Sequence, residues 1–175
     1  MLASVLPFSV FNQAFAVGTS EIFGSGFMRT LARWLRTIVV DPDANLIPAM
    51  RAGAFGLRHG RVLILFPEGE RSVDGTPKVF KKGAAILATH LQVPIVPVAL
   101  NGFYEVWPRG KKFFQKFNRL QMTFGDPLFP PRRDHPTEAD YAQLTSELRS
   151  RVVQMLTEQG GKSAAHDSAR AAAAD

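Results

Sequence analysis

Cysteine is absent from all 175 residues of the chain. Its absence excludes disulfide bonds, catalysis by a thiolate nucleophile and metal sites built on cysteine. A chain without cysteine is compatible with a reducing, cytosolic compartment, although it does not require one.

The amino-terminal region also lacks positive charge and a long apolar run. The first 28 residues carry a single charged side chain, Glu21, and the first basic residue is Arg29. A secretory signal begins with a positive region, so the Ala-Phe-Ala sequence at 14–16 does not indicate a cleavage site. A proline and two amide side chains interrupt the segment, so no run of about 18 apolar residues remains to span a membrane. We predict a buried strand and loop here that begin abruptly inside a core.

What the chain does have is enough apolar sequence for one core. Hydrophobic residues make up 46% of it, which excludes a disordered protein and predicts one domain rather than two. Lysine and arginine number 21 against 15 aspartate and glutamate, a formal net charge of +6 at pH 7. This excess favours an anionic partner. It does not distinguish among a phosphorylated substrate, a membrane surface and a nucleic acid.

Apolar periodicity predicts helices and strands in the first sixty residues. Residues 27–38 have large apolar side chains at helical spacing, which predicts an amphipathic helix. Its opposite, basic face carries Arg29, Arg33 and Arg36. A short strand is expected at 37–40, before a turn at 41–43. If Asn45 caps the next helix, Pro48 falls in its first turn. The inner stripe of that helix would be Met50, Ala54 and Leu57.

Five further elements are predicted after residue 60. The apolar run 61–66 is typical of a strand covered on both faces. It is followed by a helix at 81–91, an edge or irregular strand at 94–100, a strand at 120–124 and a last helix from 137 to 158. The inner stripe of the last helix is Leu144, Leu148, Val152 and Met155. This alternation predicts an α/β fold with a mixed, largely parallel sheet flanked by helices. The domain would span 1–159, and residues 160–175, without a large apolar side chain, would be a disordered tail.

The densest polar cluster is the sequence FPEGERS at 66–72, here called the FPEGERS motif. It begins where the apolar run 61–66 ends, and ligand sites in α/β sheets favour the carboxyl ends of strands. The proline stops the strand, Gly69 lets the backbone approach a ligand, and Arg71 offers a planar fork that matches phosphate oxygens. Glu68 could orient that fork. On spacing alone, a charged and solvated turn is an equal alternative.

The FPEGERS motif resembles the glycerophosphate-binding motif F-P-E-G-x-R-S of the 1-acyl-glycerol-3-phosphate acyltransferase family, with all six specified positions matched. Residues 93–98, VPIVPV, resemble the family block V-P-[IV]-[VI]-P-V, and residues 80–85, FKKGAA, resemble the helix start between the two. Their order and spacing agree with the family over roughly residues 2–129. Two ordered motifs are a stronger signal than a single glycine loop. The resemblance implies a fold similar to that of glycerol-3-phosphate acyltransferases and an O-acyltransferase of phospholipid biosynthesis.

The resemblance also implies roles for individual residues. The phosphate of the acceptor would be bound by Glu68, Gly69, Arg71 and Ser72. Of these, Ser72 would support the turn. Additional positive charge could come from Lys81 or Lys82. The family's second block, G-x-x-[FI]-x-x-R, is poorly kept at 36–42, where arginine replaces the glycine and proline replaces the arginine. A phosphate contact from that block is left open, with Arg33 or Arg36 as substitutes.

The motif that performs the family's chemistry, N-H-x-x-x-x-D, is not found ahead of the FPEGERS motif, because no histidine precedes His59. In the family its histidine is the general base on the acceptor hydroxyl, and its aspartate orients the imidazole. The opening residues LASVLP resemble the stretch after this aspartate, so we expect a chain without its catalytic segment. A formal match from His135 to Asp140 follows the FPEGERS motif, and Thr137 with Asp140 indicates a capping box instead. His59 and His90 are expected to be surface or packing residues.

Residues 107–119 interleave aromatic side chains with five cations and no acid. Such a segment suits anionic lipid headgroups, with each basic residue contributing on the order of 1 kcal/mol. It also suits single-stranded nucleic acid. A hairpin with its phenylalanines inward and its lysines in water is an equal alternative to the membrane interpretation.

Three functions are compatible with these patterns. The first is acyl transfer from acyl-CoA or acyl-carrier protein to the hydroxyl of a lysophosphatidate-type acceptor. Its expected partners are that acceptor, the acyl donor and a membrane surface, without nucleic acid, and its expected location is peripheral, at the cytoplasmic face of the membrane. No cofactor or metal is expected beyond the acyl donor. The second is an inactive remnant or fragment that still binds glycerophosphate or membrane, and a distant third is a nucleic-acid-binding module.

Overall fold

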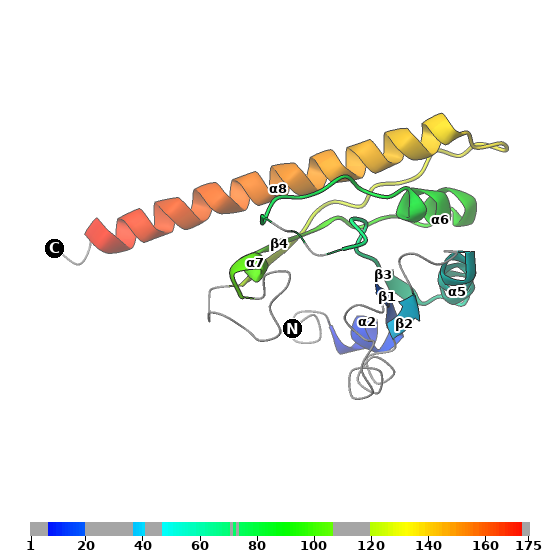
Figure 1. The fold of residues 1–175 in the computed structure, drawn as a ribbon, viewed down its shortest axis with the longest axis horizontal. Helices are drawn as coiled ribbons and strands as arrows, with labels where there is room; N and C mark the ends of the chain where they lie inside the picture. Colours follow the sequence, from blue (N-terminus) through cyan, green and yellow to red (C-terminus); the bar gives the residue numbers. More distant parts are fainter. Residues whose placement is uncertain are drawn as a thin grey trace.

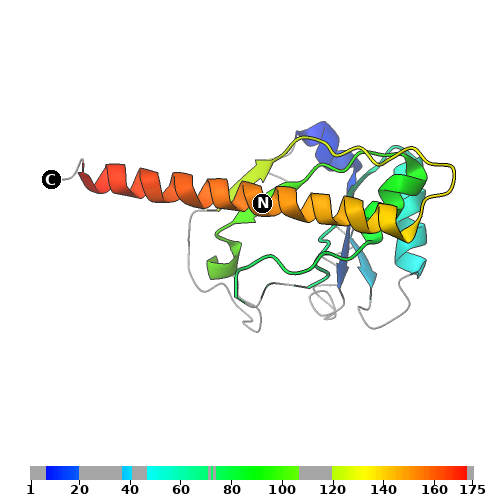
Figure 2. The same ribbon diagram turned by 90° about the horizontal axis from the view of Figure 1, so that it is seen from above.

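The computed structural model describes residues 7–19, 37–40, 47–70, 72, 74–106 and 120–172. Its elements form three levels in Figure 1. The long helix α8 (Glu138–Ala172) runs along the top, helix α6 (Gly83–Leu91) and strand β4 (Val98–Asn101) lie beneath it, and a small sheet with helix α5 (Ile47–Arg58) lies at the bottom. Seen from above in Figure 2, α8 crosses the whole molecule, and its carboxyl-terminal end projects beyond the other elements.

The lower sheet has three parallel strands in the order β2-β1-β3. Helix α2 (Phe8–Gln13) leads directly into the central strand β1 (Ala14–Thr19), which pairs with β2 (Thr37–Val40) on one side and β3 (Val62–Ile64) on the other. Parallel strands need a long crossover connection, and α5 supplies it between β2 and β3. The strand predicted at 37–40 is therefore confirmed, whereas the helix predicted at 27–38 lies largely outside the described residues.

Strand β3 is more exposed than the sequence predicts. The apolar run 61–66 indicated a strand covered on both faces, but Val62 is 39% exposed and Phe66 is 53% exposed. The prediction is wrong because α5 packs on the face of the strand that carries Leu63, whereas Val62, on the opposite face, is partly exposed. Within the described part of the chain, β3 is also an edge of its sheet. Apolar sequence alone could not distinguish an edge strand from a central one.

Helix α5 packs closely against β3 and α6 through a glycine. A Cβ atom added at Gly53 would lie 3.3 Å from a methyl carbon of Leu63 and 3.3 Å from one of Leu87. The buried residues of α5 are Ala49 and Gly53, so its inner face is shifted by one position from the predicted stripe of Met50, Ala54 and Leu57. Small residues let the helix axis come close, and the longer side chains then lie at the margins of the contact.

The second sheet is an antiparallel pair formed by β4 and β5 (Gln121–Phe124). An isolated bridge between Ile95 and Leu128 extends the pairing past Pro97, which is fully buried. The proline has no N–H to donate, so the regular ladder begins after it, as predicted for an irregular strand with two prolines. The short helix α7 (Phe103–Val106) follows β4. Residues 107–119 lie outside the described part.

The main core lies between α6 and α8. Its buried members include three positions one turn apart on the final helix, Tyr141, Leu144 and Leu148. Val152 packs against this cluster and Met155 is buried, so the stripe predicted for the last helix is confirmed. The other buried members of the cluster are Phe80, Ala85, Ala88 and Leu128. The fold is mixed α/β with a parallel sheet, as the sequence predicted.

Helix α8 is longer than predicted. It continues to Ala172, whereas the sequence indicated an end near 158 and a disordered tail from 160. The stretch after 160 contains no proline and is rich in alanine, the best helix former, and it prolongs a helix that the core has already nucleated. Among the helices that the structure describes, none is both long and apolar enough to cross a bilayer.

Candidate functional site

The FPEGERS motif forms a tight turn just after the carboxyl end of β3. The amide of Gly69 donates a hydrogen bond to the carbonyl of Phe66 at 3.1 Å. Gly69 has φ = +76°, a left-handed conformation that glycine adopts without steric cost. The chain then returns to the motif, because the amide of Lys81 donates to the carbonyl of Pro67 at 2.7 Å.

The side chain of Lys81 lies directly against this turn. A Cβ atom added at Gly69 would be only 2.8 Å from both Cε and Nζ of Lys81. The missing side chain at position 69 therefore provides the space that the lysine occupies. The result is an ammonium group, a point charge on a flexible stem, at the backbone of the turn.

The two acids of the motif both contact Lys78. The Oε2 atom of Glu68 accepts a hydrogen bond from the backbone amide of Lys78 at 2.9 Å, in a partly buried position. The Oε1 atom of Glu70 lies 2.5 Å from Nζ of Lys78, and these side chains are 38% and 31% exposed. Glu68 is thus held through the backbone, and Glu70 through a solvent-screened ion pair.

Ser72 lies at the start of a second, smaller turn. Its Oγ accepts a hydrogen bond from the amide of Gly75 at 2.8 Å and lies 3.0 Å from the carbonyl of Thr76, to which it can donate. Asp74 accepts from both the amide and the hydroxyl of Thr76, at 2.9 and 2.7 Å. These bonds, chiefly the one from the Thr76 hydroxyl, lower the pKa of the Asp74 carboxyl. The turn that Ser72 closes carries the chain from the motif toward Lys78.

The two lysines offered by the sequence have different environments. Lys81 lies at the motif, whereas the ammonium of Lys82 lies 2.5 Å from Oε2 of Glu138, at the start of α8. Of the two, Lys81 is the better placed to meet a ligand at the turn. Arg71 lies outside the described residues, as do Arg33 and Arg36, so the phosphate contacts predicted for them stay predictions.

The formal His135 to Asp140 match has a structural role, as predicted. Asp140 accepts hydrogen bonds from the amide of Thr137 at 2.8 Å and from its hydroxyl at 2.7 Å. The Thr137 hydroxyl in turn accepts from the amide of Asp140 at 3.3 Å, which is the reciprocal pattern of a capping box. The other carboxylate oxygen pairs with Nε of Arg133 at 2.9 Å, while His135 is exposed. The bonds from Thr137, followed by the charge of Arg133, hold the pKa of Asp140 below its usual value.

His59 and His90 are exposed residues with packing contacts, in agreement with the surface or packing roles that the sequence suggested. Nδ1 of His59 lies 2.8 Å from the carbonyl of Phe55, and the rings of these two residues lie 4.2 Å apart. Nε2 of His90 lies 2.8 Å from the hydroxyl of Tyr141, which ties the end of α6 to α8. Each histidine therefore lies at a helix end with a partner of its own.

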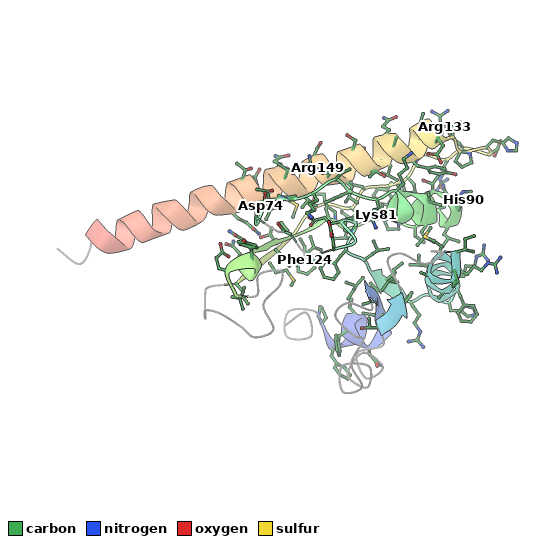
Figure 3. All side chains as sticks on the ribbon, viewed as in Figure 1. Asp74, Lys81, His90, Phe124, Arg133 and Arg149 are labelled. Carbon is green, nitrogen blue, oxygen red and sulfur yellow. The ribbon has the colours of Figure 1, made fainter. Side chains whose placement is uncertain are left out.

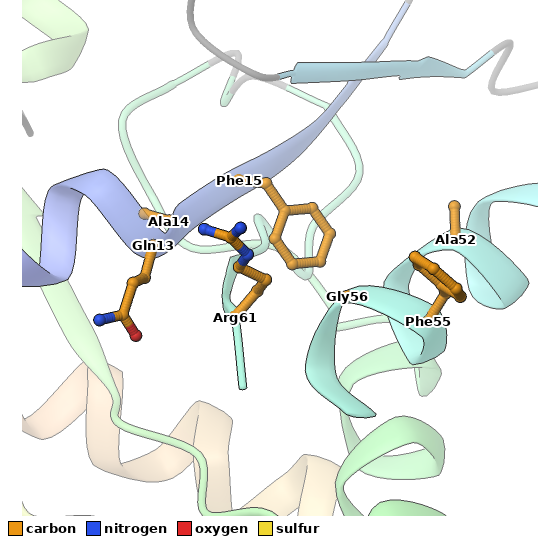
Figure 4. Close-up of a pocket in the computed structure, with 7 residues that line it drawn as sticks. All are labelled: Gln13, Ala14, Phe15, Ala52, Phe55, Gly56 and Arg61. Atoms are coloured by element: carbon orange, nitrogen blue, oxygen red, sulfur yellow. The ribbon is translucent and has the colours of Figure 1, made fainter. Parts of the chain in front are cut away.

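A pocket of about 680 Å³ lies at the other end of the parallel sheet. Figure 4 shows Phe15 and the guanidinium of Arg61 facing it from the starts of β1 and β3, with Phe55 on α5 across the opening. Gly56 permits this arrangement, because a Cβ atom there would lie 2.4 Å from the Phe15 ring. The FPEGERS motif follows the opposite, carboxyl end of β3, so the pocket and the motif are separate.

Sequence reasoning missed two residues that hold the motif in place. Lys78 contacts both acids, and Arg149 of α8 donates hydrogen bonds to the carbonyls of Pro77 and Lys78. Neither lies within a recognised motif. The spacing of 71 residues between Lys78 and Arg149 gives no local signal.

Comparison with known proteins gives a consistent result. A family model described as Acyltransferase matches residues 1–101. A chloroplastic 1-acyl-sn-glycerol-3-phosphate acyltransferase of Arabidopsis thaliana is 31% identical over 100 residues, which are 57% of this chain and 26% of the relative. The alpha 1-acyl-sn-glycerol-3-phosphate acyltransferase of Mus musculus is 29% identical over 133 residues, covering 73% of this chain and 45% of that protein. The chain thus spans less than half the length of these curated relatives.

A solved structure resembles the fold. It is the crystal structure of PlsC, the 1-acyl-sn-glycerophosphate (LPA) acyltransferase of Thermotoga maritima, with a TM-score of 0.61. The likeness covers 82% of this chain and 57% of that chain. At 21% sequence identity it establishes the similarity of the folds.

Proposed function

The chain belongs to the acyltransferase family, and from that premise we propose that it serves acyl transfer to a lysophosphatidate-type acceptor in phospholipid biosynthesis. The acceptor's phosphate binds at the FPEGERS motif. The acyl group comes from acyl-CoA or acyl-carrier protein. The observation that carries the proposal is the ammonium of Lys81 against the glycine of the motif, at the carboxyl end of a parallel strand.

The charges of the site suit a phosphomonoester. A phosphate of this kind carries between one and two negative charges near neutral pH and offers three acceptor oxygens. Lys81 supplies a cation at the turn, and Arg71 supplies a planar fork that could bind two oxygens together. Glu68 would then orient the Arg71 guanidinium and not the ligand, because a carboxylate beside a phosphate repels it.

The reaction itself needs a general base. The acceptor hydroxyl attacks the thioester carbonyl, its proton is removed, and the thiol of the donor leaves. General-base catalysis typically contributes about 10²- to 10⁴-fold to such a step. The sequence has no N-H-x-x-x-x-D ahead of the FPEGERS motif, so the residues of this chain account for binding of the acceptor and not for proton removal. A protein that binds glycerophosphate without turnover is the second candidate function.

We also propose that the protein acts as a peripheral protein at the cytoplasmic face of a membrane. A lysophospholipid acceptor has its acyl chain in the bilayer and its phosphate at the surface. The net charge of +6 favours an anionic surface of this kind.

Isothermal titration with sn-glycerol 3-phosphate tests the proposed binding site. We expect weak binding by the chain and weaker binding by Arg71→Lys, because a point ammonium cannot replace a bidentate fork. Arg132→Lys, outside the motif, is the matched control and should bind as the wild type does. Equal affinities for the wild type and Arg71→Lys would remove Arg71 from the site and leave the motif without its proposed role.

A further inference from the structure

Helix α8 lies along the segment that joins the FPEGERS motif to α6 (Figures 1 and 2). Arg149, which Figure 3 labels on this helix, is half-buried and reaches the segment. Its Nε donates to the carbonyl of Lys78 at 3.0 Å, and its Nη2 donates to the carbonyl of Pro77 at 3.1 Å. A planar guanidinium is suited to such a double contact because its donors have fixed directions.

The peptide group between Pro77 and Lys78 connects Arg149 to Glu68. Its carbonyl accepts from Arg149, and its N–H donates to Oε2 of Glu68 at 2.9 Å. The described peptide bonds include no cis bond, so the C=O and N–H of this group point in opposite directions. Arg149 and Glu68 therefore bind opposite sides of one rigid, planar unit.

The charge on Arg149 also acts through this unit. A cation at a peptide oxygen draws electron density toward it and makes the N–H of the same peptide a stronger donor. That N–H donates to the carboxylate of Glu68. A charged group therefore lies on each side of the peptide, Arg149 at its carbonyl and Glu68 at its N–H, and both hydrogen bonds are charge-assisted. A glutamate side chain has three rotatable bonds, and this contact restrains its carboxylate.

We propose that Arg149 is a positioning residue for acceptor binding: through the Pro77–Lys78 peptide it fixes the carboxylate of Glu68 within the FPEGERS motif. This inference rests on the function proposed above. Arg149 lies beyond residues 1–101, the part that matches the family model, so the site depends on an element outside the matched region. Arg149 touches neither the acceptor nor the reacting atoms in this scheme.

Binding measurements separate positioning from simple support of the fold. Arg149→Met should weaken binding of sn-glycerol 3-phosphate by roughly three- to tenfold, because the hydrogen bond from the Lys78 amide that restrains Glu68 loses its support. Arg149→Lys should fall between Arg149→Met and the wild type, because one ammonium can retain one of the two carbonyls. Arg151→Met, on the same helix and with the same loss of charge, should bind as the wild type does.

A double-mutant cycle with Glu68→Gln tests the route. If Arg149 acts through Glu68, the combined variant should bind no more weakly than the weaker single variant. The proposal is overturned if the two losses of affinity multiply in the combined variant, or if Arg149→Met binds as tightly as the wild type. Arg149 would then support only the fold.

A readout without ligand keeps this inference distinct from the proposed function. In amide NMR spectra, Arg149→Met should shift the Lys78 amide proton upfield and speed its exchange, whereas Arg151→Met should leave both unchanged. An unmoved Lys78 amide would contradict the relay. The wild-type chain could bind no sn-glycerol 3-phosphate while the Lys78 amide signal shifts in Arg149→Met as expected. In that case the proposed function would fail and the link from Arg149 to Glu68 would stand.

Discussion

Replacing Gly69 by alanine should separate the cost of backbone strain from the cost of displacing Lys81. Gly69 has φ = +76°, and an L side chain in this region costs about 1 to 2 kcal/mol. The added Cβ would also lie 2.8 Å from Cε and Nζ of Lys81. Because these atoms end a flexible side chain, the lysine can rotate away at little cost. We therefore expect the clash to reduce phosphate binding and the strain to reduce stability.

Gly60 provides the matched control. It has φ = +69°, so Gly60→Ala brings a similar strain, but nothing lies within 4 Å of the Cβ that would be added. For a protein of this size, about 1 to 2 kcal/mol lowers Tm by roughly 2 to 8 °C, and both variants should fall within this range. Only Gly69→Ala should weaken binding of sn-glycerol 3-phosphate, by roughly three- to tenfold for one partly solvated ionic contact.

The test measures Tm by calorimetry and affinity by titration for the wild type, Gly69→Ala and Gly60→Ala. Equal affinities for Gly69→Ala and Gly60→Ala, at comparable Tm, would show that the position of Lys81 does not matter for the ligand. The double variant Gly69→Ala/Lys81→Ala should bind no more weakly than Lys81→Ala alone, because the alanine at 69 then has no lysine to displace. A further loss in the double variant would refute the reasoning and assign a direct role to the backbone of the turn.

Three other outcomes are expected. The fold lowers the pKa of Asp140, so the stability that this group contributes is present above its unfolded value of about 3.9 and is lost as the pH falls through the folded value. Asp140→Asn should make the free energy of unfolding less dependent on pH in that acid range. The same pH dependence for both proteins, in urea titrations at pH 2 to 6, would contradict this. The chain alone should show little acyl transfer from acyl-CoA to lysophosphatidate, and His135→Ala should leave any residual rate unchanged; robust turnover abolished by His135→Ala would refute both statements. Binding to vesicles should require anionic lipid, weaken with salt and weaken on charge reversal at Lys111 and Lys112, and equal binding to neutral vesicles would exclude an electrostatic mechanism.

Sequence patterns predicted those parts of the fold that depend on residues close together in the chain. The stripe of Leu144, Leu148 and Met155 follows helical periodicity, and the capping box of Thr137 and Asp140 satisfies donors within four residues, so both were accessible from the sequence. The exposure of β3 was not accessible, because it depends on which elements pack on each face of the strand, and no pattern within 61–66 carries that information.

The same distinction applies to the candidate site. The FPEGERS motif and the nearby lysines could be recognised as a group, and the left-handed turn at Gly69 agrees with the conformational freedom of glycine. The different environments of Lys81 and Lys82 could not be predicted, because Glu138, which binds Lys82, comes 56 residues later in the chain. The contacts of Arg149 were inaccessible for the same reason.

The contacts from Arg149 have a consequence for biosynthesis. A ribosome makes the FPEGERS motif long before it makes α8, and the hydrogen bonds between them join residues 71 and 72 positions apart. Nascent protein grows at about 5 to 20 residues per second, so several seconds separate the emergence of the two elements. During this interval the Pro77 and Lys78 carbonyls have water as their partner and Glu68 lacks its final restraint. A growing chain can thus form the strand and the turn early, but the arrangement seen in the structure becomes possible only after Arg149 of α8 has been synthesised.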